Sequence, residues 1–359
     1  QEQAFATMRR AMRLSMAIGA GVALLTVAAL PWLCSLLIQG DGDVARERGF
    51  AADYLFWIAI GQVLMAVVPT IDSSFLAMKD SRTPLMLQTL AVTSNATLNW
   101  LLVPHFEVEG VAISTVISRA LVVFIGAFIL YRRGVGTLLT PSGQGASVLR
   151  ILRIGVPACI AIATYSVVYL VLLWGPLGKF GPAVRSAIGV GFSIETIFYC
   201  LYWGVGSAVA SLVGRYLGEG SPHKALAVSR LAIRTNAVIG VATSIVFVLF
   251  GTPIVRLLAE APQAIEENVR YLNYMALAQP FQAVQVACEH AIIGAGMSFP
   301  VMVGSVTMNV LRIPLAWGLT QFITLGVGGI WWAINISSIG KCIWMLVLYR
   351  QRRWLREQV

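Results

Sequence analysis

The stretch QAFATMRRAMRLSMAIGAGV, Gln3–Val22, decides the fold because a variant of it returns later in the chain. The second copy reads KALAVSRLAIRTNAVIGVAT and covers Lys224–Thr243. Self-similarity at a fixed spacing is typical of a duplicated architecture, so the sequence predicts two copies of one structural unit. Matching positions, in the same order in both copies, are Ala4 with Ala225, Ala6 with Ala227, Arg9 with Arg230, Arg13 with Arg234, Gly19 with Gly240, Pro31 with Pro253, Pro84 with Pro300 and Tyr131 with Tyr349.

The composition indicates a membrane protein. Of the 359 residues, 58% are apolar and only 12% are charged, against about 25% charged residues in a soluble domain. The apolar runs have the length of membrane-spanning helices, not of barrel strands. The net charge of +10 comes from Lys and Arg residues that lie beside these runs. Basic residues in such places anchor and orient membrane spans. We therefore expect a lipid bilayer, and no nucleic acid, as the partner.

Ten spans are predicted, and the charges between them set their direction. Basic residues gather before the first span and after the second, fourth, sixth and tenth, whereas the opposite loops are diluted by Asp and Glu. The positive-inside rule therefore predicts that both ends of this chain lie on the cytoplasmic side of the plasma (inner) membrane. The spans cover 14–38, 50–78, 85–104, 110–131, 154–176, 186–218, 231–258, 271–294, 300–323 and 329–349.

A Gly-, Ser- and Pro-bearing segment, 132–147, is interpreted as a cytoplasmic linker between two lobes. It separates a four-helix lobe, 1–131, from a six-helix lobe, 148–349, and a basic tail, 350–359, follows. The first four spans match the last four, whereas spans five and six have no partner. We therefore expect an N-terminal truncation of a six-plus-six protein, lacking about 70 residues and two helices, with the copies oriented alike as in parallel-repeat transporters.

Six motifs stand out along the chain. They are SRTPLM at Ser81–Met86, NATLNWLLV at Asn95–Val103, LRIGVPA at Leu152–Ala158, AVASLVGRYLGEGSPHKA at Ala208–Ala225, LRIPLAW at Leu311–Trp317 and GVGGIWWAINIS at Gly326–Ser337. Together they resemble the motifs of the multidrug and toxic compound extrusion (MATE) family of secondary transporters. The resemblance covers essentially the whole chain and implies an all-α, two-lobe bundle with ten of the family's twelve helices. It also implies a monomer that exports amphipathic, often cationic compounds in exchange for protons or sodium ions, without a cofactor or ATP.

Glu195 is the first candidate for the chemistry of transport. It lies nine residues into its predicted span, about 13 Å deep and near the midplane of the bilayer. Aromatic residues share its helix face, and Tyr165 and Tyr169 lie four residues apart on the preceding span. A carboxylate in an aromatic wall suits an organic cation, and a proton can compete for it. The aromatic residues on the face of Glu195 are Phe192, Phe198, Tyr199 and Tyr202. The alternative is a structural carboxyl group that hydrogen-bonds a neighbouring helix.

Two further acids, Asp72 and Glu289, precede the matched prolines by similar distances. They form a candidate coupling or gating pair, although interfacial acids that cap helices are common. Asn95 and Asn99 match asparagines of the family, and we favour hydrogen bonds between helices over a place in the cavity wall. We expect Arg312 to hold a helix in place through a carboxylate or a carbonyl group.

The chain departs from the family at the acids that bind coupling ions. The sodium-coupled branch has a glutamate near Ala163 or Thr164 and an aspartate near Gln282, and the proton-coupled branch has an aspartate in the first helix of the first lobe. None of these acids is present. Glu195 is therefore the hypothetical substitute for them, with Gln282 retained as a candidate site residue.

Other functions are weighed against export. GxxxxGK[ST], GxSxG and HExxH are absent from the sequence, so we expect no enzyme, no ATP hydrolysis and no metal site. A flippase of lipid-linked polysaccharide precursors should line its cavity with several basic residues, and the spans offer Arg119, Arg312 and Lys341. A non-transporting scaffold or a degenerate fragment is the third possibility. Dye efflux driven by an ion gradient would distinguish it from a transporter.

Overall fold

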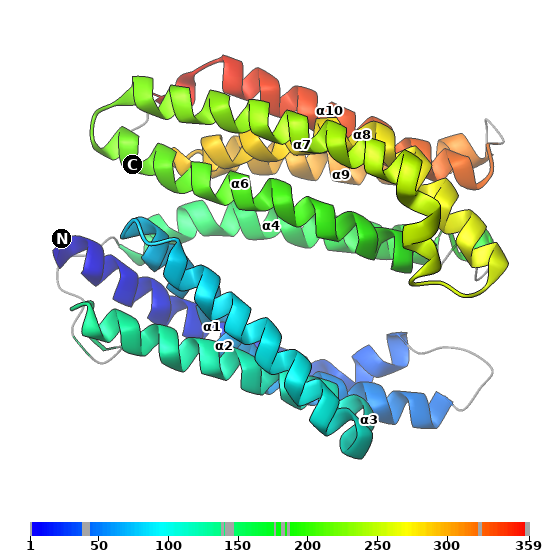
Figure 1. Ribbon diagram of the computed structural model, residues 1–359, viewed down its shortest axis with the longest axis horizontal. Coiled ribbons are helices and arrows are strands. Elements are labelled where there is room, and N and C mark those ends of the chain that lie inside the picture. The colour runs from blue at the N-terminus through cyan, green and yellow to red at the C-terminus, as the bar shows by residue number, and fades with distance from the viewer. Residues whose placement is uncertain are drawn as a thin grey trace. The chain divides into compact units, whose positions relative to one another are not determined.

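In the computed structural model the described residues are 2–37, 44–137, 140, 147–175, 177–180, 184, 187–321 and 325–355. They contain helices and no strand, and the chain divides into two compact units, Gln1–Ile151 and Leu152–Val359. The long helices are α1 (Glu2–Leu37), α2 (Val44–Ala77), α3 (Arg82–Arg132), α4 (Val148–Trp174), α6 (Phe192–Gly218), α7 (Pro222–Arg256), α8 (Pro262–Gly294), α9 (Ser298–Gln321) and α10 (Val327–Arg350) (Figure 1). Short turns of helix are η1 (Leu177–Phe180), η2 (Ala187–Gly191) and η3 (Arg353–Leu355).

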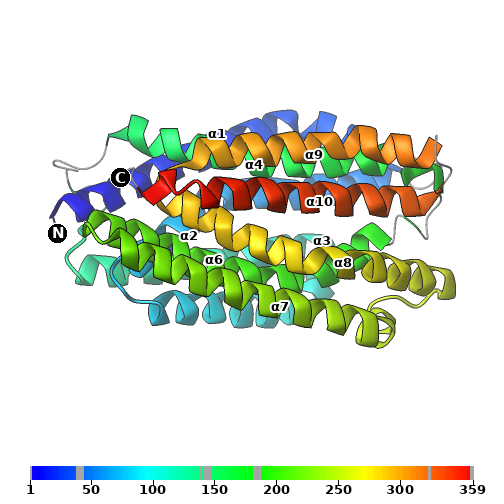
Figure 2. The ribbon, with the colours of Figure 1, turned by 90° about the horizontal axis from the view of Figure 1, so that it is seen from above.

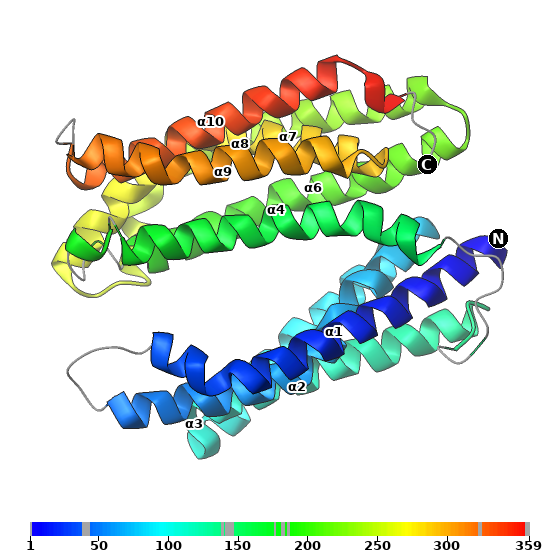
Figure 3. The ribbon, with the colours of Figure 1, turned by 180° about the vertical axis from the view of Figure 1, so that it is seen from behind.

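The first unit is built around α2, which packs between α1 and α3 (Figure 3). Apolar side chains from all three helices form its core, including Met12 of α1, Ile71 and Phe75 of α2, and Leu87 and Val122 of α3. Interiors packed in this way follow from helices whose apolar residues recur on one face.

Helix α3 is a hairpin of two helical arms, not one straight rod. Glu107 has the non-helical angles φ 47° and ψ −123°, and polar contacts join the arms on either side of it. Asn95 Nδ2 lies 3.3 Å from Thr115 Oγ1, and Arg119 Nη1 donates to Gln88 Oε1 at 3.1 Å. Two of the predicted spans are therefore the two arms of α3.

The helices of the first unit recur as the last four helical segments of the second unit. Helices α1 and α2 correspond to α7 and α8, and the two arms of α3 correspond to α9 and α10, which run side by side in Figure 2. Packing repeats as well as order. A Cβ atom on Gly19 of α1 would lie 3.0 Å from Gln62 O of α2, and one on Gly240 of α7 would lie 2.9 Å from Gln279 O of α8. The predicted repeat is therefore visible in helix-to-helix contacts.

The turns between these helices repeat as well. Glu107 has its counterpart in Gly326, whose φ is 57° and ψ is −138°. Lys79 after α2 has φ 64°, and Gly296 after α8 has φ 87°. Residues other than glycine rarely adopt these angles. The recurrence of such angles at matching loops therefore supports duplication of the whole four-segment unit.

The turn before α3 is closed by polar contacts of Asp80. Its Oδ1 accepts the backbone N–H groups of Arg82 and Thr83, both at 3.0 Å, and Arg133 lies 2.6 Å from Oδ2. The hydroxyl group of Thr83 donates to Oδ2 at 2.6 Å. Hydrogen bonds from Thr83, together with Arg133, hold the pKa of Asp80 well below its ordinary value. This turn therefore ties both ends of α3 together.

Eight helices of the described residues are long and apolar enough to cross a membrane, whereas the sequence predicts ten spans. One difference arises because the two arms of the hairpin α3 are two predicted spans but are counted as one helix. The other is α8, which is long enough but carries glutamine, glutamate and histidine along its length. Many of these polar residues face the interior of the second unit, so α8 differs in composition from the other helices. Parts of the predicted linker, 138–139 and 141–146, and the tail residues 356–359 lie outside the described residues.

Candidate functional site

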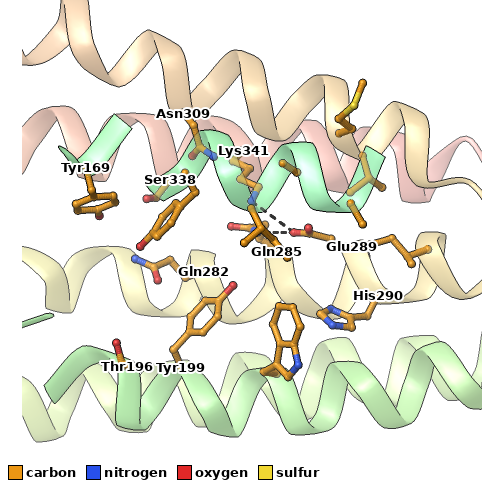
Figure 4. A pocket seen from close by; sticks show the side chains of 18 of the residues that line it. Tyr169, Thr196, Tyr199, Gln282, Gln285, Glu289, His290, Asn309, Ser338 and Lys341 are labelled. Carbon is orange, nitrogen blue, oxygen red and sulfur yellow. Dashed lines mark hydrogen bonds and ion pairs between the residues drawn. The ribbon is translucent and has the colours of Figure 1, made fainter. Parts of the chain in front are cut away.

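A cavity of about 360 Å³ lies inside the second unit, with walls from α4, α6, α8, α9 and α10 (Figure 4). Its volume falls in the range of ligand pockets, roughly 300–1,000 Å³. The charged groups on its walls are Glu195, Glu289, Arg312 and Lys341. Ionisable groups in a membrane-spanning bundle are costly to bury and often mark substrate or ion paths.

Glu195 enters the cavity from the start of α6 and is 7% exposed. The π-helical turn η2 directly precedes α6, and such turns occur frequently at functional sites. Neutral donors from α8 hold both oxygens of the carboxyl group. Tyr271 donates to Oε2 at 2.6 Å, and Gln279 and Gln282 donate their Nε2 hydrogens to Oε1, each at 3.0 Å. The predicted acid is thus buried, oriented and turned toward a cavity.

Tyr202 lies behind this group of contacts and is not part of the cavity wall. It is fully buried, and its hydroxyl group donates to Gln279 Oε1 at 3.0 Å. This bond orients the amide of Gln279, so that its Nε2 faces Glu195. A ligand contact by Tyr202 stays a prediction, and in this structure α8 covers the α6 face at that height. Phe198 also lies outside the wall and packs edge-on against Phe247 at 5.2 Å.

The predicted aromatic wall exists, on the α4 side of the cavity. The Tyr165 and Tyr169 ring centroids are 4.7 Å apart, and Tyr169 lies 5.4 Å from Phe192 of α6. The Arg312 guanidinium group lies over both tyrosine rings, 5.8 Å from the Tyr165 centroid and 5.1 Å from that of Tyr169. A cation of the protein itself therefore covers part of the surface that the sequence assigns to an organic cation.

Arg312 holds α9 to α10, but through different partners from those expected. Its Nε donates to Ser337 Oγ at 2.8 Å, and its Nη2 lies 3.5 Å from Ser338 Oγ. The expectation of a carboxylate or carbonyl partner is therefore wrong for these contacts. Within the described part of the chain, the buried Nη1 of Arg312 and Nδ2 of Asn309 have no hydrogen-bond partner.

Glu289 of α8 forms a second polar group with Lys341 of α10 (Figure 4). Lys341 Nζ lies 3.6 Å from Glu289 Oε2, which also accepts a hydrogen bond of 2.7 Å from Gln285 Nε2. The neighbouring His290 donates from Nδ1 to the carbonyl oxygen of Val286 at 2.9 Å, and its ring lies 4.6 Å from that of Trp203. Glu289, Lys341 and His290 all line the cavity.

Asp72 has a related environment in the first unit. Gln88 donates to Asp72 Oδ2 at 2.8 Å, and Arg119 donates to Gln88 at 3.1 Å. Each repeat thus places an acid near the end of its second segment and connects it to a glutamine and a cation. Asp72 and Glu289 are therefore alike in surroundings as well as in sequence position.

Asn95 and Asn99 connect the two arms of α3. Asn95 Nδ2 lies 3.4 Å from Ser114 Oγ, Asn99 Nδ2 donates to Asn95 Oδ1 at 3.2 Å, and Ser114 donates to Asn99. These contacts agree with the favoured interpretation as hydrogen bonds between helical segments. The two asparagines belong to the first unit, whereas the cavity is lined by the second.

Sequence reasoning missed Tyr271, Gln279 and Asn309. A signal was present in α8, because Gln279, Gln282 and Gln285 recur every third residue in a predicted span and so share one face. Polar amides at that spacing favour a buried polar seam over a lipid-facing helix. Among the described residues, no group of three or more His, Cys, Asp or Glu side chains is placed to hold a metal ion.

Comparison with known proteins identifies relatives among transporters. The MatE family model matches residues 157–317, and the model described as Lipid II flippase MurJ matches 1–180. A probable multidrug resistance protein NorM of Thermotoga maritima is 25% identical, covering 96% of this chain and 75% of its own length. An FAD transporter of Shewanella oneidensis is 22% identical, over 80% of this chain and 65% of that protein.

The fold has close counterparts among solved structures. An outward-facing multidrug resistance MATE family transporter of the MOP superfamily superposes with a TM-score of 0.87. The match covers 98% of this chain and 82% of the other at 17% identity. At that identity the likeness establishes the shared fold.

Proposed function

Because the chain belongs to the MATE family of membrane transporters, we propose that it exports small amphipathic compounds in exchange for a cation that binds at Glu195. The observation that supports this role most strongly is the setting of the carboxyl group. It is buried on a cavity wall, and three neutral donors from α8 orient it. A cargo cation or a coupling ion reaching the cavity would neutralise its charge.

Gln282 supports the idea that Glu195 substitutes for the family's missing acids. The resemblance places an aspartate near Gln282 in the sodium-coupled branch, and in this chain the Gln282 amide donates to Glu195 at 3.0 Å. In this chain the carboxylate at that contact belongs to α6, and its amide partner belongs to α8. A carboxylate supplied from the facing helix can serve the same exchange.

A proton suits this site better than a sodium ion. Hard metal cations require several oxygen ligands, whereas the contacts of Glu195 include two amide N–H donors and a tyrosine hydroxyl group that points its hydrogen at the carboxylate. Binding a metal cation would require both amides to turn. A proton needs only the carboxyl oxygen, so we propose proton exchange.

Transport by purified protein in liposomes tests this proposal. A pH gradient should drive rhodamine B movement in the wild type, and Glu195→Gln should reduce the initial rate at least about tenfold, because the amide cannot exchange a proton. Glu219→Gln makes the same chemical change at the end of α6, outside the cavity, and should transport normally. If Glu195→Gln kept the wild-type rate, or a sodium gradient alone drove transport, the proposed coupling would be wrong.

A second candidate function is movement of a lipid-linked precursor across the membrane. The match of residues 1–180 to the MurJ model favours it, and Arg312 and Lys341 place two cations in the cavity. Glu195 and Glu289 balance that charge, so a pyrophosphate headgroup meets two carboxylates as well. We therefore rank export of a smaller amphipathic compound first.

A further inference from the structure

We propose that the α9–α10 wall of the cavity binds an acidic group, so that the exported compound is an amphipathic zwitterion or anion, not a simple organic cation. The acidic group would be a carboxylate, a phosphate or a sulfonate. This inference rests on the proposed export function and specifies its substrate class.

The first argument is that buried donors on this wall lack acceptors. Arg312 is 4% exposed and Asn309 is 2% exposed. In the described part of the structure, Arg312 Nη1 and Asn309 Nδ2 have no hydrogen-bond partner. An unpaired buried donor costs about 1–3 kcal/mol, and more when it is charged, so native proteins rarely keep one without a reason. An oxygen-rich ligand group would supply the missing acceptors.

The second argument is that the donors converge. Asn309 and Arg312 are three residues apart on α9, and Ser338 and Lys341 are three residues apart on α10, so each pair shares a helix face. All four side chains line the same cavity. Figure 4 shows Asn309, Ser338 and Lys341 on the side away from Thr196 and Tyr199 of α6. A guanidinium group, an ammonium group, an amide and a hydroxyl group together form an oxyanion receptor.

Electrostatics argue against a simple cation at this wall. The Arg312 guanidinium group already lies 5.1 Å from the Tyr169 ring centroid, so an organic cation stacking there would approach a like charge. Glu289 is a partner of Lys341, but at 3.6 Å the contact is longer than a hydrogen bond, so the ammonium group keeps donors for a ligand. Glu195, held from α8, supplies a separate place for a positive centre. The cavity therefore suits a molecule with both charges.

Equilibrium binding to the purified protein in detergent tests the inference without an ion gradient. Rhodamine B carries a free carboxylate beside a cationic xanthene ring, and its ethyl ester is the matched cation. Fluorescence anisotropy, corrected for protein-free micelles, should give at least about tenfold tighter binding for rhodamine B, which is the worth of one charge-assisted contact. Arg312→Gln should remove that preference by weakening rhodamine B alone.

Further variants keep the test decisive if Arg312→Gln does not fold. Asn309→Leu and Lys341→Gln should each weaken rhodamine B severalfold and leave the ester unchanged, and the exposed Arg230→Gln is the matched control. Equal affinity for the two dyes, or equal weakening of both by the wall variants, would overturn the inference. Loss of transport with the dye preference intact would instead count against the coupling proposal alone.

Competition distinguishes two sources of the acidic group. Phenyl phosphate represents a soluble aromatic compound, and dioctanoyl phosphatidic acid represents a lipid headgroup. Displacement of rhodamine B by phenyl phosphate assigns the site to soluble cargo, and displacement only by the lipid assigns it to a headgroup. Either result supports an oxyanion site, and failure of both competitors contradicts it.

Discussion

Glu107 adopts a backbone conformation for which the second repeat uses glycine. Glu107 has φ 47° and ψ −123° at the tip of the α3 hairpin, and its counterpart Gly326 has φ 57° and ψ −138°. A side chain at a positive φ crowds the adjacent carbonyl group and costs about 1–2 kcal/mol. The first unit therefore keeps a strain that the second unit avoids.

Glu107→Gly should raise the free energy of unfolding by about 1 kcal/mol, because glycine relieves the strain. Thermal unfolding of the purified protein in detergent measures the change as a higher midpoint. Val108→Gly is the contrasting variant. Val108 has helical geometry and is exposed, so glycine there should lower stability by about 0.5–1 kcal/mol. A lower midpoint for Glu107→Gly would contradict the assignment of strain.

The site residues show how far sequence reasoning reaches. The spacing of Tyr165 and Tyr169 is a property of a single helix, and their rings lie together in the structure, on the wall of the cavity that Glu195 also lines. The contacts of Tyr271 and Tyr202 depend on how α8 packs against α6. Helical periodicity does not encode that packing. Tyr202 shares the face of Glu195, yet α8 covers it. Contacts between helices thus decided which predicted residues reach the cavity.

At the scale of elements, glycines set how closely paired helices approach. In α1, a Cβ atom on Gly19 would lie 2.9 Å from Ala66 Cβ of α2, whereas one on Gly21 would meet no atom within 4 Å. The same close approach recurs between Gly240 of α7 and Ala283 of α8. Small residues at such crossings allow helices in membranes to pack through their backbones.

Alanine at these two positions of α1 should have opposite effects. Gly19→Ala should destabilise the protein by about 1–3 kcal/mol, because α1 and α2 must separate to admit the methyl group. Gly21→Ala adds a methyl group in open space and should stabilise the helix by up to about 1 kcal/mol. Thermal unfolding midpoints of the two variants, measured side by side in the same detergent, check the prediction. A shift in the same direction for both would show that α1–α2 packing is not the controlling contact.

At the scale of the whole molecule, the duplicated sequence anticipated the helix order and the matching turns, because repeats preserve both. The count of spans was less predictable. The hairpin in α3 turns at Pro104 and Glu107 without a long polar loop, and α8 carries a polar seam that only a buried position accommodates. Composition measures hydropathy along the chain and does not report which face a polar residue occupies.

The positive-inside rule predicts that both ends of the chain and the connections after α2, α3 and α6 face the cytoplasm, because 17 of the 26 Lys and Arg residues lie at these places. Green fluorescent protein fused after Val359 should therefore fluoresce in a bacterial host, and alkaline phosphatase fused there should be inactive. Alkaline phosphatase fused after Ala261, between α7 and α8, should be active, because that loop lies on the opposite side of the membrane.

Replacing Arg350, Arg352 and Arg353 by glutamine should weaken the preference for this orientation without reversing it, since basic residues beside the other cytoplasmic turns remain. Active phosphatase at Val359, or inactive phosphatase at Ala261, would show that the orientation is opposite or that the number of spans between them is even.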